Sequence, residues 1–266
     1  MKSVAGISIA AGLVMGFGLA TPAKATITVQ NFWHMGEDNN PLPTDSVGGK
    51  NFTGGFSTTP TSFHAPSTGS TASMNYNGFA GNYMANAADD ITVPTTNWML
   101  ELWVNFNSLN GQVNIGSLGT DTVGDGSIKS WAKIGYSGNN FFFGRENDTF
   151  GVISDLPVVT NTWYELAFVQ HDGLIHGFVN GIEANDLNFG DNGASFNNNG
   201  QIHIGVKPGG GQNLDGWIDD VRFSTFAQGG FNPNDLMVNS APEPAPMAAL
   251  GLGALAIVRR RRRKSA

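Results

Sequence analysis

The chain of 266 residues contains no cysteine. Disulfides, cysteine nucleophiles and thiolate metal sites are therefore excluded, and the folded state must rest on an apolar core. Between residues 26 and 241 there is also hardly any helical periodicity. Short apolar runs recur there instead, separated by Gly, Asn and Asp, and 36 glycines with 11% aromatic residues suit short strands joined by tight turns. The composition predicts an all-β protein.

Positive charge is scarce outside the two ends of the chain. Eight of the 14 Lys and Arg residues lie within the first 24 or the last eight positions, so residues 26–241 carry six cations against 20 Asp and Glu, a net charge of −14. A surface of this sign repels nucleic acid and anionic lipid and attracts divalent cations. We therefore expect no nucleic-acid partner.

Both ends of the chain have the pattern of export signals. Lys2 precedes an apolar run, and Ala23-Lys24-Ala25 is a small-x-small cleavage site, so we expect residues 1–25 to be a signal peptide. Near the other end, a 12-residue apolar stretch at 247–258 is shorter than the roughly 20 residues that span a bilayer unaided. It is preceded by Pro242, Glu243 and Pro244 and followed by five cations, Arg259, Arg260, Arg261, Arg262 and Arg263.

This arrangement at residues 241–266 resembles the PEP-CTERM sorting signal of Gram-negative envelope proteins, with Pro242-Glu243-Pro244 as the signature tripeptide. The resemblance implies cleavage near the tripeptide by an exosortase-type membrane transpeptidase and delivery to the cell surface or extracellular matrix. It also implies contact with the inner membrane only through this signal, before processing. A single-span tail anchor or a disordered basic terminus is the alternative.

Strand patterns fill the remaining residues, 26–240. The clearest covers 99–106, where Leu100, Leu102 and Val104 alternate with Glu101 and Trp103. We expect further strands at 26–33, 113–117, 130–136, 140–145, 149–153, 163–170, 175–179, 201–206 and 216–224.

Turn chemistry and the missing crossover helices decide the fold class. Asp172-Gly173 and Asn180-Gly181 tolerate positive φ and predict hairpins, while residues 36–73 predict long loops around one or two short strands. Without crossover helices a parallel α/β sheet is excluded. The sequence predicts one domain, a two-sheet antiparallel jelly-roll sandwich.

Three segments, 98–105, 162–169 and 214–223, resemble the core strands of laminin-G-like, concanavalin A-type domains, and 32–37 resembles their opening strand. The resemblance covers about residues 27–236. It implies the fold more than the function, because this fold serves lectins, adhesion modules, glycosidases and spacers.

Catalytic residues are not expected. Laminarinase-type glucanases of this fold use a Glu-x-Asp-x-x-Glu strand motif, and the nearest segment here, Glu146-Asn147-Asp148, has Gly151 in place of the last carboxylate. A turn explains that segment equally well. No metal-site spacing occurs among the five histidines, which are His34, His64, His171, His176 and His203. His171 and His176 flank a predicted hairpin and can approach each other.

Calcium is the expected ion, because the exported domain is acidic and offers oxygen ligands. The resemblance implies a structural calcium ligand at Asp219, and Glu37 is its expected partner, since the first and last strands of this fold are neighbours. Asp45 and Asp220 are weaker additions. Alternatively, Asp219 caps backbone N–H groups or pairs with Arg222.

Sugar binding needs exposed aromatic rings beside hydrogen-bonding groups, and Trp131, Tyr136 and Phe142 lie in a region rich in Gly and Asn. Core packing explains at least two of these three rings equally well. Taken together, the sequence favours a non-catalytic domain that binds extracellular polysaccharide or a matrix protein. A glycan-cleaving enzyme of the same fold and a passive structural protein remain the alternatives.

Overall fold

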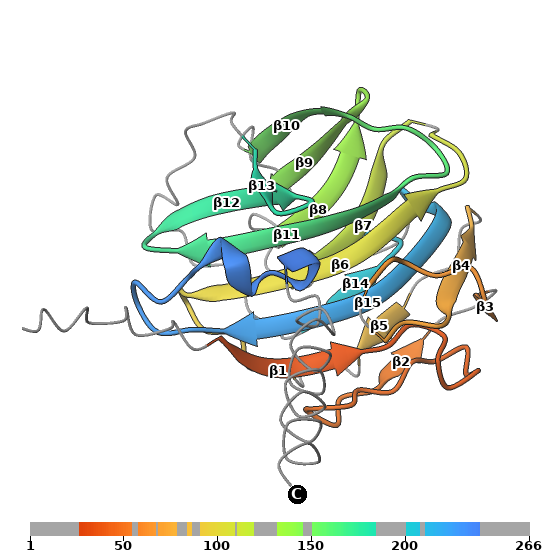
Figure 1. Cartoon of the computed structure of the whole chain (residues 1–266), viewed down its shortest axis with the longest axis horizontal. Helices are drawn as coiled ribbons and strands as arrows, with labels where there is room; N and C mark the ends of the chain where they lie inside the picture. The colour runs from red at the N-terminus through yellow and green to blue at the C-terminus, as the bar shows by residue number, and fades with distance from the viewer. Residues whose placement is uncertain are drawn as a thin grey trace, which may run out of the picture.

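A computed structural model describes residues 27–54, 58–67, 69–78, 84–86, 91–109, 111–119, 132–145, 151–184, 201–207 and 211–239. These residues form two antiparallel sheets packed face to face (Figure 1). The all-β jelly-roll sandwich predicted from the sequence is confirmed. Residues 1–25, the segment 146–148 and the signal at 241–266 lie outside the described residues. Within the described part of the chain, no helix has the length and apolar character needed to cross a membrane.

The first sheet has eight strands. Their order is β13 (Ile182–Glu183), β12 (Leu174–Val179), β11 (Trp163–His171), β6 (Trp98–Phe106), β15 (Asp215–Thr225), β4 (Ser73–Asn77) and β3 (Thr59–Thr61), and β1 (Thr28–Trp33) also pairs with β15. The opening and closing strands are therefore neighbours, as expected.

The second sheet has seven strands. Their order is β10 (Gly151–Pro157), β9 (Asn140–Arg145), β8 (Ala132–Ser137), β7 (Val113–Leu118), β14 (Ile202–Ile204), β5 (Met84–Asn86) and β2 (Phe52–Gly54).

The core lies between the sheets and follows the alternation seen in the sequence. Leu100, Leu102 and Val104 of β6 point into it, and the opposite face of the strand carries Glu101 and Trp103. All nine residues of β6 are buried, so both faces of this central strand are covered.

The predicted hairpin turns are confirmed. Asp172 and Gly173 adopt φ angles of 51° and 77° between β11 and β12, and Asn180 and Gly181 adopt 52° and 76° between β12 and β13. Positive φ at both central residues gives the tight turn whose twist matches the paired strands.

A segment after β15, residues 226–239, crosses the outer face of the eight-stranded sheet, and we call it the C-terminal strap. It contains two 3-10 turns, η1 (Pro233–Asp235) and η2 (Met237–Asn239), which Figure 1 shows in front of β11 and β6. Leu236 of the strap is fully buried and packs in one cluster with Met99 and Val169. The strap therefore covers this half of the outer face.

Polar contacts beneath the strap hold it to the sheet. Glu101 accepts hydrogen bonds from Arg222 Nε at 2.7 Å and from the Met237 N–H at 2.9 Å, and Arg222 Nη2 donates to the Asp235 carbonyl at 2.8 Å. Burial raises the pKa of Glu101, and burial together with Glu101 raises the pKa of Glu165 well above its ordinary value. Arg222 therefore forms its ion pair with Glu101 and not with Asp219. The alternative that Asp219 pairs with Arg222 is wrong.

Candidate binding site on the outer face of the eight-stranded sheet

Aromatic side chains line the part of the outer face that the C-terminal strap leaves uncovered. Trp163 begins β11 and Trp217 lies near the start of β15, and both pair with Asn105 of β6 between them. Paired residues on neighbouring strands present their side chains on the same face. Trp163, Asn105 and Trp217 therefore form a row across the sheet.

Phe63, from the loop between β3 and β4, completes this cluster. Its ring centroid lies 5.3 Å from that of Trp163 and 4.8 Å from that of Trp217, with the Trp217 contact close to edge-on. Aromatic contacts of this geometry each contribute about 0.5–1.5 kcal/mol. Phe63 is 42% exposed and both indoles are half-buried. We call Phe63, Trp163 and Trp217 the aromatic patch.

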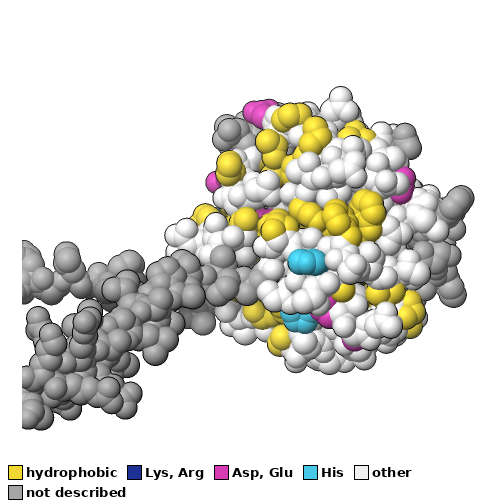
Figure 2. Space-filling model, turned by 45° about the vertical axis from the view of Figure 1, so that its right-hand side comes forward, with side chains coloured by type: hydrophobic (Ala, Val, Ile, Leu, Met, Phe, Trp, Pro, Cys, Tyr) yellow, Lys and Arg dark blue, Asp and Glu magenta, His cyan; other side chains and the backbone are white. Residues whose placement is uncertain are grey.

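The side of the molecule that carries β3 and β4 has little positive charge (Figure 2). Figure 2 turns the side with β3 and β4 toward the viewer and shows a band of hydrophobic side chains across it. Among the described side chains on this face, no Lys or Arg is visible. Such a face suits an uncharged partner better than an anionic one.

Polar atoms without partners lie beneath the rings. Asn105 is fully buried, and neither its Oδ1 nor its Nδ2 has a hydrogen-bond partner among the described residues. The indole N–H of Trp163 is buried and unpartnered in the same way. A buried polar group left unpaired costs about 1–3 kcal/mol. Because Asn105 is fully buried, only the aromatic rings above it offer a surface to a ligand.

Carboxylates hold the loop of residues 62–72 that carries Phe63. Asp219 Oδ2 accepts hydrogen bonds from the Ala65 N–H at 2.8 Å and from Ser70 Oγ at 2.6 Å. Glu37 Oε1 accepts from the backbone N–H groups of Thr71 and Ala72 at 2.6 and 3.1 Å. We call residues 62–72 the anchored loop, since side chains from β15 and from the turn after β1 hold it at two places.

A third carboxylate extends this anchoring. Asp220 accepts a hydrogen bond from Ser67 Oγ at 2.5 Å, and its other oxygen lies 2.9 Å from His34 Nδ1. The hydrogen bond to Asp220 raises the pKa of His34. Asp220 has a φ of 38°, at an irregularity in the pairing of β15 with β6. This break in alternation lets consecutive residues Asp219 and Asp220 both reach the anchored loop.

The expected partners Glu37 and Asp219 therefore do converge on one loop. Each keeps one buried oxygen, Glu37 Oε2 and Asp219 Oδ1, that has no hydrogen-bond partner in the described structure. Burial, assisted by the negative charges of Asp220 and Glu37, raises the pKa of Asp219 to about 7. The described residues contain no group of three or more His, Cys, Asp or Glu side chains placed to hold a metal ion. The capping role considered for Asp219 is seen directly.

Asp45 does not take part in this arrangement. Its two oxygens accept hydrogen bonds from backbone N–H groups of its own turn, among them those of Val47, Gly48 and Lys50 at 2.9–3.0 Å. These bonds, with one from Asn31, lower the pKa of Asp45 against the effect of burial. Asp45 therefore stabilises a turn rather than joining Glu37 and Asp219.

The aromatic residues singled out from the sequence have different positions. Tyr136 is 4% exposed and its ring packs in the core, 5.6 Å from that of Phe106. This placement corrects the expectation that Tyr136 offers an exposed platform, because the alternation of β8 turns it inward with Ile134. Phe142 is half-buried on the outer face of the seven-stranded sheet, and Trp131 lies outside the described residues.

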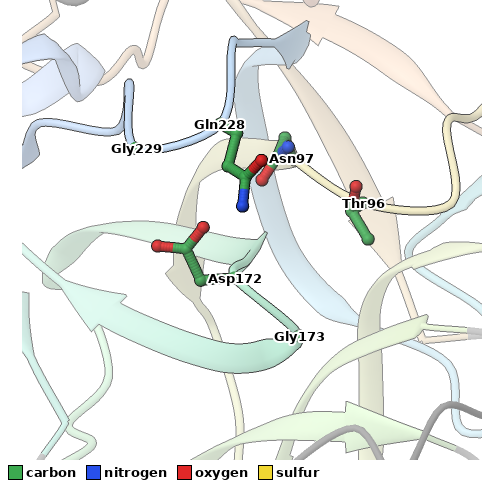
Figure 3. Close-up of a pocket in the computed structure, with 6 residues that line it drawn as sticks. All are labelled: Thr96, Asn97, Asp172, Gly173, Gln228 and Gly229. Atoms are coloured by element: carbon green, nitrogen blue, oxygen red, sulfur yellow. The ribbon is translucent and has the colours of Figure 1, made fainter.

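Two other features lie at the far end of the first sheet. The rings of His171 and His176 stack with centroids 4.2 Å apart, which confirms that the hairpin brings them together. A hollow of about 480 Å³ is lined by Thr96, Asn97, Asp172, Gly173, Gln228 and Gly229. Figure 3 shows the side chains of Asp172 and Gln228 pointing toward one another across it. No aromatic ring is among these lining residues, so the hollow offers no stacking surface.

Comparison with known proteins places this architecture. Residues 79–228 match the model of the concanavalin A-like lectin/glucanases superfamily, and residues 240–263 match the PEP-CTERM protein-sorting motif. The chain belongs to the concanavalin A-like lectin/glucanases superfamily, and it carries a PEP-CTERM sorting motif. The motif implies export to the cell surface and processing by an exosortase. Both resemblances noted in the sequence are confirmed.

Solved structures with this fold differ in function. The chain is similar to domain 4 of AbnA, an extracellular arabinanase from Geobacillus stearothermophilus in complex with arabinotriose, with 17% identity, a TM-score of 0.57 and coverage of 80% of this chain and 98% of that one. It is also similar to Trypanosoma rangeli sialidase, with 11% identity, a TM-score of 0.56 and coverage of 80% of this chain and 32% of that one. A third similar structure is the botulinum neurotoxin serotype G binding domain, with 14% identity, a TM-score of 0.56 and coverage of 80% of this chain and 50% of that one. The chain thus spans about a third and about half of these last two proteins. No curated protein matches the sequence.

Proposed function

We propose that this surface protein is a non-catalytic carbohydrate-binding module that associates with extracellular polysaccharide through the aromatic patch. The observation that carries the proposal is the exposed contact of Phe63 with Trp163 and Trp217 on the uncovered part of the outer face. Sugar rings present apolar C–H faces and a rim of hydroxyl groups. Aromatic rings bind the apolar faces, and polar side chains beside the rings bind the hydroxyl groups.

The carboxylates near the patch support a module without catalysis. Asp219 and Glu165, which lie on the same face of the sheet, are both fully buried. Asp219 is occupied by the anchored loop, and Glu165 lies beside Glu101 under the C-terminal strap. Glycoside hydrolysis needs two carboxyl groups that flank an accessible glycosidic bond. Neither of these groups is accessible enough for that role.

Binding can be tested with the purified exported protein and a panel of polysaccharides in affinity electrophoresis. We expect Trp163→Ala and Trp217→Ala each to weaken retention by about tenfold, which corresponds to about 1.4 kcal/mol. Ile182→Ala is the matched control, because Ile182 is 73% exposed on the edge strand β13 of the same sheet. Thermal melts identify any variant that fails to fold.

Three results would redirect the assignment. Release of reducing sugar from a polysaccharide would establish the glycan-cleaving alternative. If a polysaccharide retains both tryptophan variants as strongly as the wild type, the binding site lies elsewhere on the domain. Failure of the wild-type protein to bind any polysaccharide would favour a matrix-protein partner or a passive structural role.

We also propose a structural Ca²⁺ ion held by Glu37 Oε2 and Asp219 Oδ1, since each of these two carboxylates keeps one oxygen without a hydrogen-bond partner among the described residues. Calcium takes about six to eight oxygen ligands, so backbone carbonyls and water would complete its shell. The ion would supply the positive charge that a buried pair of carboxylates lacks. Thermal melts in calcium and in EDTA test this: calcium should stabilise the wild-type protein but not Asp219→Asn, and an equal response of both proteins would contradict the site.

A further inference from the structure

A polar pocket opens beside the aromatic patch. It has a volume of about 420 Å³, within the usual range for small-molecule sites. Side chains with hydroxyl, amide or carboxylate groups line it, namely Asn77, Ser108, Gln112, Gln212, Asn213 and Asp215. They come from the ends of β4 and β6 and from the segments before β7 and β15. We call this cavity the rim pocket.

The rim pocket and the aromatic patch share a strand. Asp215 and Trp217 are two positions apart on β15, so their side chains point to the same face about 7 Å apart. Asn107, which follows β6, donates a hydrogen bond from Nδ2 to Asp215 Oδ1 at 3.1 Å. The row of Trp163, Asn105 and Trp217 therefore continues directly into the pocket wall.

Hydrogen bonds hold the pocket walls in place before any ligand arrives. Ser108 Oγ donates to Asp215 Oδ2, which fixes the carboxylate from a second side. Gln212 accepts a hydrogen bond from Lys133 Nζ at 2.8 Å and donates one to Gln112 at 2.9 Å. A wall fixed in this way loses little conformational entropy when a ligand binds.

Two observations indicate the chemistry of the ligand. Asn213 Oδ1 is buried and has no hydrogen-bond partner among the described residues, so a ligand hydroxyl can satisfy it. Asp215 is the charged residue in the lining, and the nearby Lys133 is only 2% exposed and donates a hydrogen bond from Nζ to Gln212. Such a lining favours neutral hydroxyl groups over carboxylate, sulfate or phosphate.

We propose that the rim pocket binds the terminal residue of an uncharged glycan, and that the following residues of the glycan lie across the aromatic patch. This inference rests on the proposed carbohydrate-binding function and adds to it the part of the chain that is recognised. The volume holds a small sugar but not a polymer, whereas the open patch accepts successive rings. The module is thus selective for chain ends of neutral glycans.

The test uses isothermal titration of the exported protein with neutral arabinan and xylan, with oligosaccharides of each, and with anionic alginate. Cutting a neutral polymer into shorter chains at constant mass should raise the binding stoichiometry in proportion to the number of chain ends. Asn213→Ala should weaken binding of the oligosaccharides tenfold or more, while Gln30→Ala, which changes an exposed amide elsewhere, should leave it unchanged. Melting temperatures confirm that both variants are folded.

The outcomes separate this inference from the function on which it rests. Wild-type binding that is lost in Trp163→Ala but kept in Asn213→Ala would retain the carbohydrate-binding function and overturn the role of the pocket. A stoichiometry that follows polymer mass rather than chain ends, or tighter binding of alginate than of any neutral glycan, would also overturn it. No binding of any glycan by the wild-type protein would remove both.

Discussion

Replacing Asp219 by Asn should change how the stability of the protein depends on pH. Asp219 is fully buried, and its pKa is raised from 3.8 to about 7. The folded state therefore binds the proton of Asp219 more tightly than the unfolded state does. The contribution of Asp219 to the free energy of unfolding is most favourable below about pH 4, falls as the pH rises, and levels off above about pH 7.

The size of this effect follows from the pKa. Each tenfold change in proton affinity corresponds to about 1.4 kcal/mol, so the ionised carboxylate costs about 4 kcal/mol in alkaline solution without calcium. Between pH 4.5 and 8.5 the contribution of Asp219 to the free energy of unfolding falls by about 3 kcal/mol. Asn removes the titration and can still accept the hydrogen bonds of the Ala65 N–H and Ser70 Oγ through its side-chain oxygen.

Urea unfolding in EDTA at pH 4.5 and 8.5 measures the effect. The free energy of unfolding of Asp219→Asn, relative to the wild type, should be about 3 kcal/mol more favourable at the higher pH. Comparing two proteins at each pH cancels the titration of other groups, including Asp45, whose lowered pKa acts in the opposite direction. Asp155→Asn, at an exposed position, is the control. An identical pH dependence of wild type and Asp219→Asn would refute the reasoning.

Further predictions concern the covered face and the core, and the same unfolding assay at pH 7 tests them. Glu101→Ala leaves Arg222 without its anionic partner and should cost about 3–5 kcal/mol. Glu165→Gln should cost less than about 1 kcal/mol, because burial and the neighbouring Glu101 raise the pKa of Glu165 well above its ordinary value and so disfavour its ionised form. Equal losses would contradict this difference. Gly177→Ala should cost about 1–3 kcal/mol, because the added Cβ would lie 2.3 Å from the Phe143 ring in the opposite sheet. An unchanged stability would show that the two sheets can move apart at this point.

Much of the fold follows from local patterns in the sequence. The alternation in 99–106 assigns both faces of β6 correctly, and Asp172-Gly173 and Asn180-Gly181 predict their hairpins because positive φ restricts the residues at these positions. The strand β4 (Ser73–Asn77) is not among the predicted strands, although Met74 and Tyr76 alternate with Ser73, Asn75 and Asn77, because it is short and follows a long loop rich in Gly, Ser and Thr. Its pairing with β15 fixes the register in which Met74 and Tyr76 enter the core.

The candidate site was less accessible to sequence reasoning. The sequence predicts strands at both Trp163 and Trp217. Their common contact with Phe63 depends on how β11 and β15 pair with β6, and on a loop about 100 residues earlier in the chain than Trp163. The inward position of Tyr136 could have been found, because Lys133 is a poor core residue and alternation then turns Ile134 and Tyr136 inward. That Glu37 and Asp219 reach one loop agrees with the neighbouring positions of the first and last strands, and their partnership as calcium ligands stays a prediction.

The C-terminal strap also determines how far the sorting motif can move from the domain. Asn239 ends the strap, and Pro242 follows three residues later, a separation of at most about 10 Å of extended chain. The hydrogen bond between the Met237 N–H and Glu101 fixes the point at which this short stretch of chain leaves the domain. If the processed end is joined to a surface, a short linker would therefore hold the domain close to that surface. The orientation of the sandwich on that surface, and with it the direction in which the aromatic patch faces, would be set by the strap instead of by free tumbling.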